Sequence, residues 1–316
     1  MKFLLVGNYG VGNLGDEALK NYFLKSFPGV EWQVLSASPV KGELPRLPGG
    51  VRSFLTFHWF RTVQALKGSD GLVFGGGSLF TDTESVRACI LWWIHACCAW
   101  VLRKPTFLAF QGIGPFRTRL GERLSRSVLS HAAFISVRDS ASAERIEPWK
   151  KNTKVIRSFD PVFMDFPKQN SDRSENVFII IPRAGGEESL RKAVTEALGK
   201  KSFSKTRILL LEPENASEQR IARRLQASIS GTSIVPIRSI DELKREMEGA
   251  SLVLSARYHG ALAALAAGKE IMLIPERAGD KLSALWECIP MTEEKKHALL
   301  ERIEAGEREL RVALRH

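Results

Sequence analysis

The strongest constraint on the fold is a regular alternation of short apolar runs with longer segments of helical periodicity. Runs such as Phe3–Val6, Thr106–Phe110 and Val177–Ile181 have the length and composition of buried strands. Segments with apolar residues at helical spacing separate them along nearly the whole chain. Strands that alternate with helices in this way predict parallel sheets covered by helices, so the expected fold class is α/β.

A polar segment divides this alternation into two sets. Residues 167–176 read PKQNSDRSEN, which is the composition of a linker, and the strand–helix pattern restarts after them. We therefore expect a Rossmann-like domain at 1–166, a second one at 177–290, and a charged helix at 291–316. Two such domains would face each other, and the active site is expected in the cleft between them.

The charge of the chain is positive and unevenly distributed. Of the formal net charge of +11, residues 1–165 carry +8, with 21 Lys or Arg against 13 Asp or Glu. This favours an anionic partner: a phosphorylated substrate, an acidic lipid surface or nucleic acid. Because the chain has no signature of a nucleic-acid-binding motif, we expect no nucleic acid partner.

Cysteine usage and apolar content bear on the location of the protein. The 4 cysteines form no CxxC pair, which is consistent with a reducing compartment. The start, MKFLLVGNYG, enters a strand directly, so we expect no signal peptide and a cytoplasmic protein. Residues 88–102 are apolar but too short to span a bilayer. They favour a buried helix over an interfacial one.

Glycines and polar side chains follow the strands of the first half. The turn GNYGVGNLGDEAL (7–19) lies between a strand and a helix, and its glycines allow backbone N–H groups to approach an anion or a sugar. Within it, Asp16 either caps the helix or faces a ligand as a carboxylate base. A short strand, Gly71–Phe74, is expected to end at three consecutive glycines, Gly75 to Gly77, which precede Ser78 and indicate a binding edge.

Basic side chains follow strands in both halves. Arg138 comes directly after the strand 134–137, where an arginine usually has a carboxylate or phosphate partner. Asp139 or Asp160 would make that partner a structural ion pair. In the second half, four basic side chains follow strands and together suit a compact anion; they are Arg183, Arg257, His259 and Lys281. The alternative for His259 is a structural residue in a helix cap.

An ordered set of motifs resembles the polysaccharide pyruvyl transferase family. The motifs are GNLGDEAL, GGGSLFTD, QGIGP, VRDSAS, DPVF and SARYHG with a later lysine, in order over roughly residues 5–285. Bacterial members include the ketal pyruvyltransferases of secondary cell-wall polysaccharide. The family is similar to GT-B glycosyltransferases but uses phosphoenolpyruvate as donor. Two positions depart from its pattern: Tyr258 stands where Leu is common, and Gly279-Asp280-Lys281 where Asp-Pro-Lys is usual.

The resemblance implies a set of roles for individual residues. Arg138, His259 and Lys281 would contact phosphoenolpyruvate, with help from Arg183 and Arg257. His259 would protonate the methylene carbon as general acid, and Asp16 would be the base for the acceptor hydroxyl. The acceptor would bind at Asn13, Gly15, Gly76, Gly77 and Ser78. No metal and no cofactor beyond the donor is expected, because no ligand cluster of the usual spacing is present.

The basic first half of the chain favours a glycan acceptor linked to a lipid diphosphate, which would bring the protein into peripheral contact with the inner face of the membrane. Two other functions compete with this interpretation. A GT-B glycosyltransferase would bind a nucleotide sugar through a carboxylate of the second domain, for which Glu212, Glu214 and Glu276 are available. The second competing function is that of a non-catalytic glycan-binding protein with the same fold.

Overall fold

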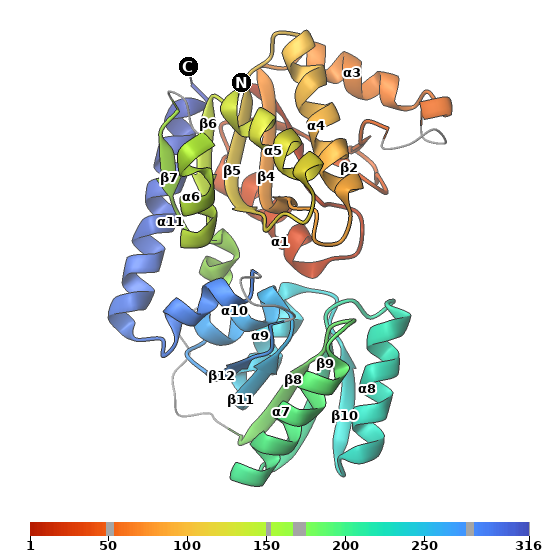
Figure 1. Ribbon diagram of the computed structural model, residues 1–316, viewed down its shortest axis with the longest axis vertical. Helices are drawn as coiled ribbons and strands as arrows, with labels where there is room; N and C mark the ends of the chain where they lie inside the picture. Colours follow the sequence, from red (N-terminus) through yellow and green to blue (C-terminus); the bar gives the residue numbers. More distant parts are fainter. Residues whose placement is uncertain (49–53, 150–152, 167–174, 276–280, 316) are drawn as a thin grey trace. The chain divides into compact units, whose positions relative to one another are not determined.

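The computed structural model describes residues 1–48, 54–149, 153–166, 175–275 and 281–315 (Figure 1). The chain forms two compact units. The first consists of Met1–Pro161 together with Leu299–His316, and the second is Val162–Ala298. Each unit is an α/β unit with its own parallel sheet, as the alternation of strands and helices predicts.

The first unit is built on a seven-stranded sheet in the order β3-β2-β1-β4-β5-β6-β7, in which every neighbouring pair is parallel. Its strands are β1 (Lys2–Val6), β2 (Glu31–Ser36), β3 (Leu44–Pro45), β4 (Gly71–Phe80), β5 (Thr106–Ile113), β6 (Phe134–Val137) and β7 (Val155–Arg157). Its helices are α1 (Leu14–Ser26), α3 (Trp59–Lys67), α4 (Val86–Val101), α5 (Arg119–Ser130), α6 (Ser140–Ile146) and the later part of α11 (Glu293–Ala313).

The second unit has a five-stranded parallel sheet in the order β10-β9-β8-β11-β12. Its strands are β8 (Val177–Ile181), β9 (Lys205–Leu210), β10 (Thr232–Pro236), β11 (Ala250–Ser255) and β12 (Glu270–Leu273). Its helices are α7 (Glu187–Lys200), α8 (Ala216–Ser228), α9 (Ile240–Glu248) and α10 (Tyr258–Ala266). All five residues of β8 are buried, as expected for a central strand covered on both faces.

Successive side chains of a strand point to opposite faces, and the two cores of the first unit follow this rule. Leu4 of β1 belongs to the core that contains Trp92 and other residues of α4. Its neighbour Leu5 belongs to the core that contains Phe23 of α1 and Leu310 of α11. Helix α4 therefore covers one face of the sheet, while α1 and the end of α11 cover the other.

The apolar segment 88–102 lies in α4, and one side of this helix is buried against the sheet. In α4, Cys89, Trp92, His95, Ala96 and Ala99 are buried, whereas Val101 is 82% exposed. Among the described residues, no helix combines the length and the apolar character that crossing a bilayer requires.

The predicted ends of two strands are wrong. The sequence predicts that β4 stops at Phe74, before the glycines, but the strand continues to Phe80. Gly75 pairs with Ala109 and Gly77 with Gln111 of β5, which itself runs three residues past its predicted end. The glycines have a low strand propensity, but a neighbouring strand supplies the ladder hydrogen bonds that keep them in the sheet.

Candidate functional site

The first cluster of polar side chains lies at the start of α1 and consists of Asn8, Asn13 and Asp16. Asn13 is the N-cap, and its Oδ1 accepts hydrogen bonds from the N–H groups of Gly15 (3.0 Å) and Asp16 (3.4 Å). The Asp16 carboxylate is therefore not needed as the cap. Its Oδ2 accepts a hydrogen bond from Asn8 Nδ2 at 3.2 Å, and the residue is 8% exposed.

The same carboxylate lies against the glycine segment of β4. A Cβ atom on Gly77 would come within 2.9 Å of Asp16 Oδ1, and one on Gly76 within 2.9 Å of Leu19 Cδ2. Gly77 also has φ of 82°, a left-handed value that favours glycine. The structure thus brings Asn13, Gly15 and Asp16 together with both glycines, at the edge where the sequence predicts acceptor binding.

A chain of hydrogen bonds continues from this edge into the sheet. Arg138 Nη2 donates to Ser78 Oγ at 2.7 Å, and Nη1 donates to Asp160 Oδ2 at 2.7 Å. Arg138 is 1% exposed and Asp160 is 0% exposed. Of the two partners that the sequence offers, Asp160 is the one that forms the ion pair. Asp139 instead caps α6, where it accepts the Ser142 N–H.

The second unit carries its polar group at the carboxyl ends of β9 and β11. The Arg257 guanidinium binds Glu212, at 2.6 Å, and also Glu218. We call these three residues the Arg257 clamp. Arg257 is also the N-cap residue of α10, so the clamp fixes the backbone from which that helix starts.

The two carboxylates of the clamp differ in their electrostatics. Burial pushes the pKa of Glu212 upwards, but the hydrogen bond and charge of Arg257 outweigh it, so the pKa lies below its usual value. Burial raises the pKa of Glu218, and Arg257 offsets this only in part. The other neighbours differ as well: Asn215 and the charge of Arg183 lower the pKa of Glu212 further, whereas the charge of Glu212 raises the pKa of Glu218.

His259 lies in the first turn of α10, two residues after the clamped arginine. The glycine that follows it is required by packing, because a Cβ atom on Gly260 would come within 2.6 Å of Ile181 Cδ1 and 2.9 Å of Ser255 Oγ. Helix α10 therefore sits close against β8 and β11, and its first N–H groups lie at the carboxyl edge of the sheet. Such a helix start favours a bound anion.

The remaining predicted cations belong to the same unit. Arg183 follows β8, is half-buried, and its charge helps to lower the pKa of Glu212. Lys281 is half-buried and precedes a short 3₁₀ helix, Ser283–Cys288. Of the carboxylates considered for a nucleotide, Glu214 pairs with Arg238 at 3.6 Å, and Glu276 lies outside the described residues.

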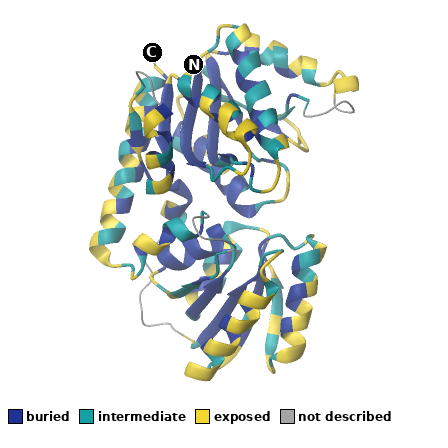
Figure 2. Cartoon of the chain, viewed as in Figure 1, coloured by how far each residue is buried: buried dark blue, intermediate teal, exposed yellow. Residues whose placement is uncertain are grey.

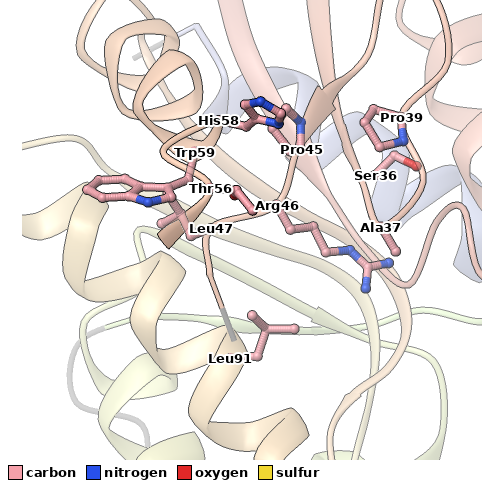
Figure 3. A pocket seen from close by; sticks show the side chains of 10 residues that line it. All are labelled: Ser36, Ala37, Pro39, Pro45, Arg46, Leu47, Thr56, His58, Trp59 and Leu91. Carbon is pink, nitrogen blue, oxygen red and sulfur yellow. The ribbon is translucent and has the colours of Figure 1, made fainter. Parts of the chain in front are cut away.

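A pocket of about 380 Å³ opens in the first unit near the carboxyl ends of β2 and β3 (Figure 3). Its lining residues are Ser36, Ala37, Pro39, Pro45, Arg46, Leu47, Thr56, His58, Trp59 and Leu91. Arg46 donates to the Tyr9 carbonyl at 2.7 Å and stacks over Trp92 at 5.2 Å. Its Nε is buried and has no hydrogen-bond partner among the described residues.

Comparison with known proteins decides the family. The sequence model of the family described as polysaccharide pyruvyl transferase matches residues 13–275, most of the chain. The chain belongs to the polysaccharide pyruvyl transferase family. The resemblance carried by the ordered motifs is thereby confirmed.

This chain is similar to a curated relative, the amylovoran biosynthesis protein AmsJ of Erwinia amylovora. The two are 30% identical over 100 residues, which is 31% of this chain and 23% of AmsJ. The chain thus aligns with about a quarter of that relative's length.

Solved structures support the GT-B-type fold of this family member. HepE of Anabaena, in complex with UDP, aligns with a TM-score of 0.60 and 13% identity over 99% of both chains. MnaA of S. aureus, also with UDP, aligns with a TM-score of 0.58 and 12% identity, over 98% of this chain and 94% of MnaA. At these identities the likeness shows the fold, and the predicted fold of two Rossmann-like units is confirmed.

Several residues of these groups escape sequence analysis. Asn8 lies two residues after the end of β1 and so obeys the rule that ligand-facing residues lie at carboxyl ends of strands, but its contact with Asp16 depends on the turn between them. Glu218 lies on a helix face that the sequence marks as merely charged. Arg46 lies in a Pro-rich segment with no motif. Among the described residues, no three His, Cys, Asp or Glu side chains are grouped as a metal site would require.

Proposed function

We propose that this protein transfers the pyruvyl group of phosphoenolpyruvate onto a sugar of a cell-surface polysaccharide precursor, as a cyclic ketal, with release of phosphate. The observation that carries the proposal is His259 in the first turn of α10, next to the clamped Arg257, in a chain of this family. The likeness to AmsJ, a protein of amylovoran biosynthesis, supports a role in polysaccharide assembly.

In this proposal the second unit binds the donor. Phosphoenolpyruvate carries a carboxylate and a phosphate, and Arg183, Lys281 and the first N–H groups of α10 supply the complementary charges. In Arg138, Nη1 donates to Asp160 and Nη2 donates to Ser78. The Arg257 guanidinium is bound to Glu212 and Glu218. We therefore assign these two arginines mainly a positioning role: Arg138 orients the Ser78 hydroxyl, and Arg257 fixes the start of the helix that carries His259.

The chemistry requires one acid and one base. Protonated His259 gives its proton to the methylene carbon, which becomes a methyl group and leaves C2 electron-deficient. A sugar hydroxyl adds to C2 and loses its proton to Asp16. A second hydroxyl of the sugar then forms the other C–O bond as the C2–O bond to phosphate breaks, and its proton leaves with the phosphate. Of the two hydroxyl protons, the one taken by Asp16 returns through solvent to restore His259.

The acceptor is assigned to the first unit. Asp16 lies against Gly77 and beside Asn8, and the pocket around Arg46 supplies a cation and the Trp59 ring. This combination of an aromatic ring and polar groups suits a sugar residue or its phosphate. The cleft between the two domains and the lipid diphosphate on the acceptor stay predictions.

The deciding experiment measures donor binding and turnover in parallel. Phosphoenolpyruvate should raise the melting temperature of the wild type, and a glycan acceptor should make it release phosphate. His259→Ala should keep the melting temperature but lose about 10²–10⁴ in kcat. His297→Gln, an exposed histidine of the same unit, is the matched control and should retain activity.

Two outcomes would count against the proposal. Unchanged turnover in His259→Ala would remove the assigned acid. A melting-temperature shift with UDP-glucose and none with phosphoenolpyruvate would favour the second candidate, a GT-B glycosyltransferase, for which the fold shared with UDP-bound HepE is the supporting observation.

A further inference from the structure

Three phenylalanines form an exposed row beside α3. Phe54, Phe57 and Phe60 are 51%, 64% and 54% exposed, and Leu55 between them is 63% exposed. Figure 2 shows this end of α3 as exposed. Four large apolar side chains within seven residues make a surface that a folded protein normally covers.

The row is held in place by its own backbone. The Phe57 N–H donates to the Phe54 carbonyl (3.5 Å) and the Phe60 N–H to the Phe57 carbonyl (3.0 Å), so two backbone turns join the residues that carry the three rings. Trp59 fixes the first member, since its ring stacks on Phe54 at 5.4 Å and its Nε1 donates to the Phe54 carbonyl at 2.9 Å.

The backbone of the central member is unusual. Phe57 has φ of 56°, in the left-handed region that bulky residues avoid, and yet its side chain has the highest exposure of the four. Intramolecular packing of the Phe57 ring does not account for the strained conformation. Such local strain is typical of segments with a binding role.

The charge around the row is of one sign. From residue 44 to residue 69 the sequence contains 4 Lys or Arg and no Asp or Glu. Arg61 and Lys67 of α3 are exposed, while Thr62 and Leu66 anchor the opposite side of the helix. The surface therefore combines exposed aromatic rings with positive charge.

We propose that residues 54–61 dock the protein on an anionic lipid bilayer. Aromatic rings at the boundary of headgroups and acyl chains, with basic groups on anionic lipids, are the two components of interfacial binding. A second copy of the chain is the weaker candidate, because a symmetric contact would place two positive surfaces against each other. The proposal does not depend on pyruvyl transfer.

The docking surface also borders the pocket of the first unit. Thr56, His58 and Trp59 line that pocket together with Arg46 (Figure 3). A phosphate-bearing headgroup at the membrane surface would therefore lie next to a cation. This arrangement fits a lipid-linked acceptor, should the proposed function hold.

The test is flotation with vesicles of phosphatidylcholine alone or mixed with phosphatidylglycerol, in the absence of any substrate. Wild type should float only with the anionic vesicles, and added salt should release it. Phe57→Ser/Phe60→Ser should bind about tenfold more weakly or worse, because both rings lose their burial in the interface. Arg61→Glu should weaken binding by a similar factor.

The matched controls come from the second unit. Trp286→Ser changes an aromatic residue that is 51% exposed, and Arg223→Glu reverses an exposed charge on α8; both should bind as wild type. All changed residues are exposed, so melting temperatures should stay within a few degrees. Equal binding of wild type and Phe57→Ser/Phe60→Ser would overturn the proposal. So would a wild-type dimer that this variant dissolves while no vesicle retains protein, which would assign the row to self-association.

Discussion

In each unit an arginine follows a strand of the sheet and binds carboxylates, but the two arginines are neutralised differently. Arg138, after β6, pairs with Asp160 at 2.7 Å, and both side chains are at most 1% exposed. Arg257, after β11, has two, Glu212 and Glu218, and its side chain is 13% exposed. The first pair is neutral and closed to solvent. The Arg257 clamp carries an excess negative charge, which draws in a further cation.

The two arginines therefore have different roles. A neutral buried pair stabilises the sheet edge and holds Ser78 but adds no net charge there. The clamp keeps Arg183 near Glu212 and fixes the start of α10, where a compact anion would bind. The sheet edge of the second unit is thus suited to collect cations around a donor. The sheet edge of the first unit is suited to present hydroxyl and carboxylate groups to an acceptor.

The largest expected effect on stability is at the Arg138–Asp160 pair. Asp160→Ala leaves the Arg138 charge buried without its carboxylate, so the free energy of unfolding should fall by about 3–5 kcal/mol in urea denaturation. Asp70→Ala, at an exposed aspartate of the same unit, should change it by less than about 1 kcal/mol.

A double change distinguishes charge from packing at this pair. Arg138→Met/Asp160→Leu replaces the pair by apolar groups and should recover most of the loss, because no buried charge remains. A loss below about 1 kcal/mol in Asp160→Ala would mean that water reaches the arginine, and the contrast between the two edges would then disappear.

The first unit also buries a neutral histidine, which makes it sensitive to acid. Burial lowers the pKa of His95 to about 4, and its Nε2 accepts the Leu47 N–H at 3.0 Å. Between the unfolded value of 6.5 and about 4, the unfolded chain binds a proton that the folded chain does not. The free energy of unfolding should therefore fall as the pH drops, by about 2 kcal/mol from pH 7 to pH 5.

Comparing variants assigns that slope to His95. His95→Gln should lower the stability at pH 7 but flatten its dependence on pH, whereas His131→Gln, at an exposed histidine, should leave the slope unchanged. A wild-type slope that persists in His95→Gln would show that other groups titrate. Hydrogen exchange should locate the acid-induced opening in α4 and the segment around Leu47.

The sequence predicts the strands, the helices and the division into two sets because these depend on apolar periodicity, which is local. It also predicts that Arg138, Arg257 and His259 stand at strand ends. It offers Asp160 as one of two partners for Arg138, but it does not predict the partners of Arg257, because Glu212 and Glu218 lie about forty residues from it along the chain. The predicted end of β4 before its glycines is wrong for the same reason: pairing with β5 outweighs their low propensity.

The smallest expected effect is at the Arg257 clamp, where one carboxylate can substitute for the other. Glu212→Gln should cost about 1 kcal/mol in unfolding free energy, because Glu218 remains bound to Arg257 and the amide that replaces the carboxylate would still accept a hydrogen bond. Glu214→Gln, at a side chain that is 89% exposed, is the control and should cost nothing measurable. A loss in Glu212→Gln as large as that in Asp160→Ala would show that Glu218 alone does not compensate the charge of Arg257. Retained stability with weaker phosphoenolpyruvate binding would instead assign Glu212 to holding the donor cations in place.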